Sequence, residues 1–429
     1  MSLDPPIPEI YVLWHPACAL GETLARRVHG WLRPGIGLGP QVFYRCLPAP
    51  EAPAGGLPPP LPDEIRPGGL PPPPPPLGSV HLGNVQIVLL LIDANMIADA
   101  AWRHWLARLA SSPAWGEPRL FLPVALDSTA FNLPSALSEF NFLRPAGLPL
   151  PQSDPPGPPG AVETVVRSLL KQLTEALCRL LLGGAGASAA PNPPAAAARD
   201  TGLPKVTLFL SHAKADGTAP ARRIRDYIYS QTQLAAFYDE NDIPYGSVFS
   251  RVLQANTSGA QTAALIAVSS ARYAARPWCR REFASFRKPL MEDPDPVCAE
   301  RWRLNPVLIV DALEGGASTH NMPEFGNTPV IRWGEEVPDQ EEQIVTTVLR
   351  DVLLAAYHAA LGRHVPPDLD CIVLNWVPDP TTLLHIPRVQ AGEGLRIYYP
   401  GRGLSGLELE ILDEAFPHVE FNSFDQVLS

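Results

Sequence analysis

Short hydrophobic runs of strand length alternate with amphipathic helical patterns along most of the chain. Strands that alternate with helices are typical of α/β domains built around a parallel sheet. In the middle of the chain, the hydrophobic pattern predicts strands at residues 205–212, 235–242, 262–270, 305–313 and 328–333, and helices at residues 220–231 and 339–361. We therefore expect one doubly wound α/β domain in this part of the chain.

The first 183 residues show the same order of elements. Strand patterns occur at residues 9–16, 40–47, 85–93 and 118–126, and helical patterns occur at residues 20–32 and 161–182. Trp102 lies nine residues after Asp93, and Trp278 lies nine residues after Ser269. Placing Trp102 on Trp278 brings Leu106 to the position of Glu282. The pattern indicates an internal duplication whose first copy lacks the glutamate. The alternative is coincidence, because α/β domains share this order in general.

Proline and glycine divide the chain into parts. Residues 47–78 are rich in proline, which predicts a solvated insertion or a polyproline II spacer, with recruitment of a proline-binding partner as the alternative. Residues 184–203 are typical of an interdomain linker. The resulting parts are a first α/β domain (1–183), the linker, a second α/β domain (204–363) and a small C-terminal α/β module (364–429) with three short strands and one helix.

Composition narrows the classes of function. The hydrophobic fraction is 46% and the formal net charge is −11, so we expect a folded protein that binds neither nucleic acid nor an anionic membrane through a broad basic face. The six cysteines have no zinc-finger spacing, and the ten histidines have no clear metal-binding spacing, so we expect no metal site. We see no secretory signal and no uninterrupted apolar span, which favours a cytoplasmic protein.

The segment from Pro277 to Phe286 carries the candidate chemistry. Proline favours the first position of a helix, so a helix is predicted to begin at Pro277. Cys279, Phe283 and Phe286 then share an inward face by helical spacing, while Trp278 and Glu282 lie one turn apart on another face. On spacing alone, the ordinary alternative is favoured, because a glutamate on a helix is usually solvated and a tryptophan one turn before it is usually a half-buried core residue.

Four motifs follow one another in a fixed order around this helix. They are Phe209 and Ser211 in the first strand; Asp239 at the end of the second strand, with Tyr245 and Gly246 in the loop after it; Ser270 and Tyr273 after the third strand; and Trp278, Cys279 and Glu282 in the helix. Together they resemble the Toll/interleukin-1 receptor (TIR) domain family over about residues 204–363. The resemblance implies a flavodoxin-like doubly wound parallel sheet, and the first domain is then expected to be a degenerate TIR-like copy.

The resemblance also implies an activity and a site. Many bacterial, plant and some animal members cleave NAD at its nicotinamide–ribose bond with one glutamate, and Glu282 occupies that position. Trp278 is expected to stack on a ring of the substrate. Phe209, Ser211, Tyr273 and the loop from Asp239 to Tyr245 are expected to border the substrate. NAD would be the substrate, with no separate cofactor, and the product would be ADP-ribose or a cyclic isomer.

Members of this family often complete the site by self-association, which can extend into filaments. The resemblance therefore implies a bacterial innate immune (antiphage) effector that assembles through its TIR domain. The first copy could cap, inhibit or nucleate that assembly, and it could respond to a partner protein or a nucleotide signal. Two alternatives stay open: a non-enzymatic TIR adaptor, and an NAD cyclase that makes a signalling nucleotide.

Overall fold

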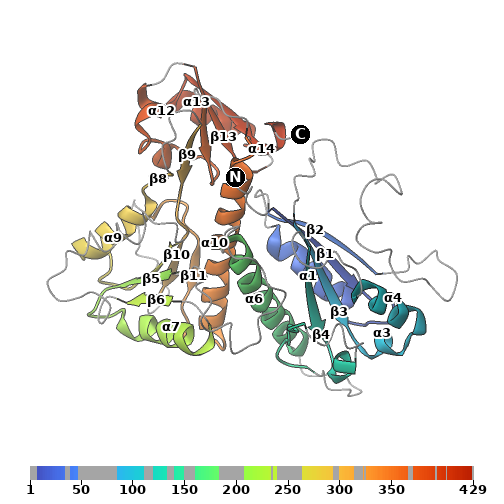
Figure 1. Ribbon diagram of the computed structural model, residues 1–429. Coiled ribbons are helices and arrows are strands. Elements are labelled where there is room, and N and C mark those ends of the chain that lie inside the picture. The colour runs from blue at the N-terminus through green and yellow to red at the C-terminus, as the bar shows by residue number, and fades with distance from the viewer. Residues whose placement is uncertain are drawn as a thin grey trace. The chain divides into compact units, whose positions relative to one another are not determined.

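In the computed structural model, the chain divides into two compact units, the first made mainly of Met1–Leu180 and the second mainly of Leu203–Val427. The residues that the structure describes are 7–33, 39–46, 85–110, 119–132, 140–148, 160–182, 207–232, 235–238, 263–292, 299–313, 322, 325–365, 371–391, 394–401 and 403–427. The proline-rich segment 47–78 and the predicted linker 184–203 lie outside these residues. Figure 1 shows the helices and strands of each unit.

The first unit is built around a four-stranded parallel sheet of order β2-β1-β3-β4. The predicted strands and helices are all present in it. The elements are β1 (Pro8–Trp14), α1 (Gly21–Leu32), β2 (Gln41–Cys46), β3 (Val85–Ile92), α3 (Ala94–Ala98), α4 (Ala100–Ala110), β4 (Arg119–Ala125), the 3-10 helix η1 (Ser128–Asn132) and α6 (Ala161–Leu182).

The second unit begins with a five-stranded parallel sheet of order β11-β10-β7-β5-β6. This is the doubly wound order expected of a flavodoxin-like fold, so the predicted fold class is confirmed. The elements are β5 (Thr207–His212), α7 (Thr218–Gln231), β6 (Ala235–Tyr238), β7 (Ala263–Ser269), α9 (Pro277–Arg287), β10 (Val307–Asp311), β11 (Val330–Arg332) and α10 (Gln340–Gly362).

The third sheet, of order β14-β13-β12-β9-β8, is the core of the C-terminal module. Its elements are β8 (Leu290–Met291), β9 (Glu300–Arg303), β12 (Cys371–Leu374), α11 (Pro380–Leu383), α12 (Pro387–Ala391), β13 (Leu395–Tyr399), α13 (Gly406–Ala415), β14 (Val419–Ser423) and α14 (Phe424–Val427). The three strands and the helix predicted for residues 364–429 are present. However, β8 and β9 come from within residues 204–363, so a cut after residue 363 would separate strands of one sheet.

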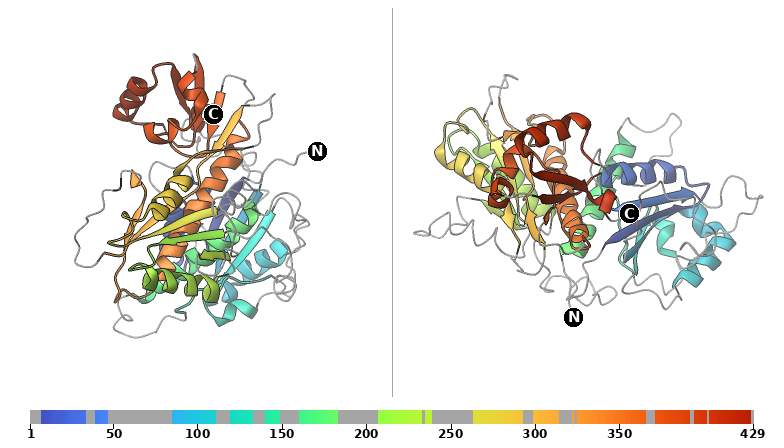
Figure 2. Two further views of the ribbon diagram at one scale, coloured as in Figure 1. Left: turned by 90° about the vertical axis from the view of Figure 1, so that its left-hand side faces the viewer. Right: turned by 90° about the horizontal axis from the view of Figure 1, so that it is seen from above.

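Helix α10 connects the two sheets of the second unit. It contacts β7 and β10 in one sheet and β9 and β12 in the other, and Figure 2 shows it in orange running toward the C-terminal sheet. Its length and apolar composition would also suit a membrane span, but most of it is buried inside the protein. Its apolar character is therefore that of a core helix.

Gly362, at the end of α10, allows the close approach to the third sheet. A Cβ atom built on Gly362 would lie 2.8 Å from Cγ1 of Val373 on β12, whereas a Cβ atom on Gly406, the first residue of α13, would meet nothing within 4 Å. Valine is stiff at χ1, so it cannot easily move aside.

We expect Gly362→Ala to lower the free energy of unfolding by about 1–2 kcal/mol, because the added methyl overpacks this contact. Gly406→Ala is the matched control, and it should be neutral or stabilising by up to about 1 kcal/mol, because alanine is the better helix former. Urea unfolding of the full chain measures both. Equal effects of the two substitutions would contradict the close packing of α10 against β12.

Candidate functional site

Helix α9 begins at Pro277, as predicted, and buries one face. Cys279, Phe283 and Phe286 are its buried residues, which confirms the predicted inward face. The ring of Phe283 lies 4.8 Å from that of Phe325, centroid to centroid, in a core cluster that also includes residues of β5, β7 and β10. This packing fixes the rotation of α9 about its axis.

Strand β5 places a hydroxyl group under this helix. Side chains alternate across a sheet with a period of two, so Ser211 lies on the same face as Phe209, which packs against α9. Ser211 is buried, and its Oγ donates a hydrogen bond of 2.6 Å to Oε2 of Glu282 on α9. The strand and the helix therefore present one joined polar group, the only part of which near solvent is the half-buried Glu282.

Tyr273, in the turn between β7 and α9, lies beneath this pair and is fully buried. Its hydroxyl is 2.9 Å from Oγ of Ser211 and 3.5 Å from the carbonyl oxygen of Cys279. Burial raises the pKa of Tyr273 well above its ordinary value, with smaller contributions from Cys279 and Glu282. Burial, together with the charge of Glu282, raises the pKa of Cys279 to about 12. Both groups are therefore neutral at physiological pH, and neither adds a second anion beside Glu282.

The position of this group in the sheet is the one that α/β proteins use for ligands. Ser211 is the last residue but one of β5, and α9 follows the end of the neighbouring strand β7. Between β5 and β7 the chain order reverses, since β6 lies on one side of β5 and β10 lies beyond β7. Ligands of open parallel sheets bind outside the carboxyl ends of the strands at this switch point.

Trp278 lies one helical turn before Glu282 and is 56% exposed. The guanidinium carbon of Arg281 lies 5.3 Å from the centroid of its ring. A cation over an aromatic face is a favourable contact that also steadies the ring. Trp278 and Glu282 are thus the two predicted site residues whose side chains reach solvent among those that the structure describes.

Two of the residues predicted to border the substrate lie deeper than expected. Phe209 is 4% exposed, and its ring packs edge-on against Phe286 at 5.1 Å, so it is a core residue and not a substrate contact. Tyr273 has no exposed surface, so it reaches the site only through Ser211. Asp239 and Tyr245 lie outside the described residues.

Sequence reasoning missed the role of Asp216. Its carboxylate accepts a hydrogen bond of 2.6 Å from Oγ of Ser270 and one of 2.9 Å from the backbone N–H of Arg272. These bonds tie the turn after β5 to the turn after β7. In the sequence, Asp216, Ser270 and Arg272 are recognisable only as polar residues near strand ends. That position does not reveal that Asp216 binds Ser270, which lies more than fifty residues away.

The first unit has the same arrangement of strands and helix around this position, but different side chains between them. Leu13 pairs with Leu90 at the end of β1 as Ser211 pairs with Ala267 at the end of β5. Seven residues then separate β3 from α4, as they separate β7 from α9, and both helices have 11 residues. This register places Leu13 at the position of Ser211, Met96 at that of Tyr273 and Trp105 at that of Glu282.

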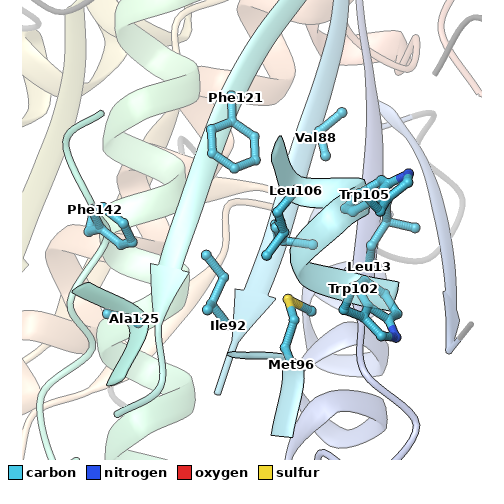
Figure 3. Close-up of a cluster of buried hydrophobic side chains, with 12 residues drawn as sticks. Leu13, Val88, Ile92, Met96, Trp102, Trp105, Leu106, Phe121, Ala125 and Phe142 are labelled. Carbon is cyan, nitrogen blue, oxygen red and sulfur yellow. The ribbon is translucent and has the colours of Figure 1, made fainter. Parts of the chain in front are cut away.

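These three side chains of the first unit belong to the buried cluster drawn in Figure 3. The structural register differs by one residue from the sequence match of Trp102 with Trp278, because the bounds of the strands and helices place Trp102 at the position of Cys279. Trp102 and Cys279 are both buried, whereas Trp278 is exposed. The residue at the position of Glu282 is therefore Trp105 and not Leu106. The first unit has no carboxylate at this position.

No metal or phosphate site emerges from the described residues. No group of three His, Cys, Asp or Glu side chains there could hold a metal ion. Gly401, Gly403 and Gly406 have the spacing of a dinucleotide-binding loop, but the N-terminus of α13 is already capped: Glu408 accepts a hydrogen bond of 2.8 Å from the backbone N–H of Ser405. The Glu408 carboxylate and the Ser405 hydroxyl, which accepts from the backbone N–H of Glu408, thus occupy two of the backbone donors that a phosphate would need.

Comparison with known proteins agrees with the motifs of the second unit. Residues 208–321 match the family model described as TIR domain. No curated protein matches the chain. A solved structure described as the activated Roq1 resistosome directly recognizing the pathogen effector XopQ (TIR domains) is similar at 14% identity, covering 36% of this chain and 84% of that chain with a TM-score of 0.20. The predicted TIR domain in the middle of the chain is confirmed by the family match.

We expect Asp216→Ala to lower the free energy of unfolding by about 1–2 kcal/mol, because the buried hydroxyl of Ser270 loses its acceptor. Asp226→Ala is the control, since it removes an aspartate whose side chain is 60% exposed and pairs with the adjacent Arg225. That change should stay within about 0.5 kcal/mol. If thermal unfolding detects no difference between the two variants, Asp216 does not join the two turns.

Proposed function

We propose that the second unit cleaves NAD at its nicotinamide–ribose bond, with Glu282 as the catalytic residue. The observation that carries this proposal is the bond from Ser211 to Glu282 at the switch point of a TIR-family sheet. A carboxylate held by a hydroxyl beneath it points in a defined direction, and an aromatic ring lies one turn away. That combination suits a cationic ring joined to a ribose.

The chemistry needs one carboxylate. The C1′–N bond breaks and its electron pair goes to the nitrogen of the cationic pyridinium, so nicotinamide leaves neutral without a general acid. The ribose is left with oxocarbenium character, as in glycoside hydrolysis. Glu282 stabilises this developing positive charge and contacts the ribose hydroxyls. Water then adds at C1′ and releases a proton, which gives nicotinamide and ADP-ribose.

Trp278 supplies the binding surface in this proposal. More than half of its surface is exposed, so a flat ring of the substrate can stack on it. We place the activity in the cytoplasm, which agrees with the buried cysteines Cys18, Cys178, Cys279 and Cys371, none of which forms a disulfide among the described residues. Depletion of NAD in an infected cell would make the protein an immune effector, a role that rests on the TIR family resemblance.

We expect Glu282→Gln to lower the rate of nicotinamide release from NAD by about a hundredfold or more, because the amide keeps the shape but not the charge. Chromatography of nicotinamide and its co-product measures this. Glu410→Gln, which removes an exposed carboxylate from α13, is the control and should leave the rate unchanged.

The outcomes separate the three candidate functions. ADP-ribose as the co-product supports the hydrolase, and a cyclic isomer indicates the cyclase. A pure, folded wild-type chain that leaves NAD intact at every concentration would support the adaptor. An active Glu282→Gln variant would overturn the role of the carboxylate.

Self-association is a second part of the proposal. Glu282 and Trp278 both reach solvent, whereas electrostatic stabilisation of a cation is most effective when water is excluded. A second copy placed against α9 would exclude that water. Completion of a site by a neighbouring copy would also couple activity to protein concentration.

We therefore expect the turnover per chain to rise with protein concentration from the nanomolar to the micromolar range, in parallel with the oligomer seen by light scattering. A constant turnover per chain over that range would show that a single copy has a complete site.

A further inference from the structure

Tyr273, Ser211 and Glu282 form a hydrogen-bonded chain with a fixed direction. A serine hydroxyl has one hydrogen to donate, and that of Ser211 goes to the carboxylate at 2.6 Å. Ser211 therefore accepts from Tyr273 at 2.9 Å and cannot donate to it. The other acceptor near the Tyr273 hydroxyl, the Cys279 carbonyl, is 3.5 Å away, which is too long to compete. Both donations thus run toward Glu282.

The fold itself does not require these hydroxyl groups. The first unit forms the same strand order, the same turn length and a helix of the same 11 residues. It does so with Leu13, Met96 and Trp105 at the three positions, all packed in one apolar cluster. Where the carboxylate is absent, both hydroxyls are absent as well. The two hydroxyl groups therefore accompany the carboxylate and are not needed by the strands and the helix themselves.

We propose that Tyr273, acting through Ser211, is a positioning residue that holds the carboxylate of Glu282 ionised and in one orientation. This inference rests on the proposed function, in which Glu282 faces the ribose. Tyr273 is fully buried and touches no substrate, so its influence must pass through the hydroxyl of Ser211.

The physical effect has two components. A hydroxyl that donates to a carboxylate favours its ionised form, and a second hydroxyl behind the first strengthens that bond by polarisation. The bond also fixes Oε2, and with it the orientation of the Glu282 carboxylate relative to the ribose. A carboxylate already turned toward the developing charge on the ribose needs no reorganisation during the reaction.

The test compares Tyr273→Phe, Ser211→Ala and the double variant in the full chain. We expect Tyr273→Phe to lower kcat for NAD about tenfold and Ser211→Ala to lower it more, with KM within about twofold, because the relay acts on the charge and not on binding. The double variant should be no slower than Ser211→Ala, since Tyr273 has no effect once Ser211 is lost.

The pH profile gives a readout that a structural defect would not change. With fewer donors, the carboxylate takes up a proton at higher pH, so the acid limb of kcat should move upward by up to about one pH unit. Tyr227→Phe is the matched control, because it removes another tyrosine–glutamate hydrogen bond, from Tyr227 to Glu342 at 3.3 Å, away from Glu282. It should leave both kcat and the acid limb unchanged.

A second measurement separates this inference from the proposed function. In protein labelled with ¹³C at the glutamate carboxyl groups, the signal missing in Glu282→Gln is assigned to Glu282. Its titration midpoint should move upward in Ser211→Ala and Tyr273→Phe, and it should stay in place in Tyr227→Phe, whether or not NAD is cleaved. An unchanged midpoint, an unchanged kcat in Tyr273→Phe or additive losses in the double variant would overturn the relay. If the wild type does not cleave NAD but the titration midpoint of Glu282 still shifts in Ser211→Ala and Tyr273→Phe, only the proposed function is overturned.

Discussion

The hydrogen bond between Ser211 and Glu282 connects the sheet of the second unit to the helix that carries its candidate chemistry. It joins side chains 71 residues apart in sequence, one on β5 and one on α9. The apolar contacts of Phe283 and Phe286 set the rotation of α9. The direction of the Glu282 carboxylate, the burial of Tyr273 and the exposure of Trp278 all depend on that rotation.

The two α/β units show that the same arrangement of strands and helix can form with or without the polar groups of the site. Their first four strands have the same order, and the ladder register at the ends of the central strands corresponds residue by residue. The first unit fills the space between strand and helix with apolar side chains, as the cluster in Figure 3 shows. The second unit replaces this filling with two hydroxyls and a carboxylate. Burying a polar group is costly unless it is hydrogen-bonded, which explains why the three polar groups occur together.

The sequence was sufficient for the strands, the main helices and the inward face of α9, because these depend on local periodicity. It was not sufficient to predict which side chains on one face of a strand are buried in the core and which lie at the site. Phe209 and Ser211 share one face by alternation, but only the position of α9 above them decides that Phe209 meets Phe286 in the core while Ser211 meets Glu282. For the same reason, the burial of Tyr273 could not be read from its motif. The short strands β8 and β9 carry no pattern that reveals their pairing with each other or the pairing of β9 with β12.

The most direct measurement of the central claim is a crystal structure of the full chain with an uncleavable NAD analogue in which a carbon replaces the ribose ring oxygen. We predict that Oε2 of Glu282 keeps its bond to Ser211 while the other carboxylate oxygen contacts the hydroxyls of the ribose that bears the nicotinamide, with Trp278 stacked on the ligand. A ligand bound away from the ends of β5 and β7, or a Glu282 side chain turned from the ribose, would contradict it.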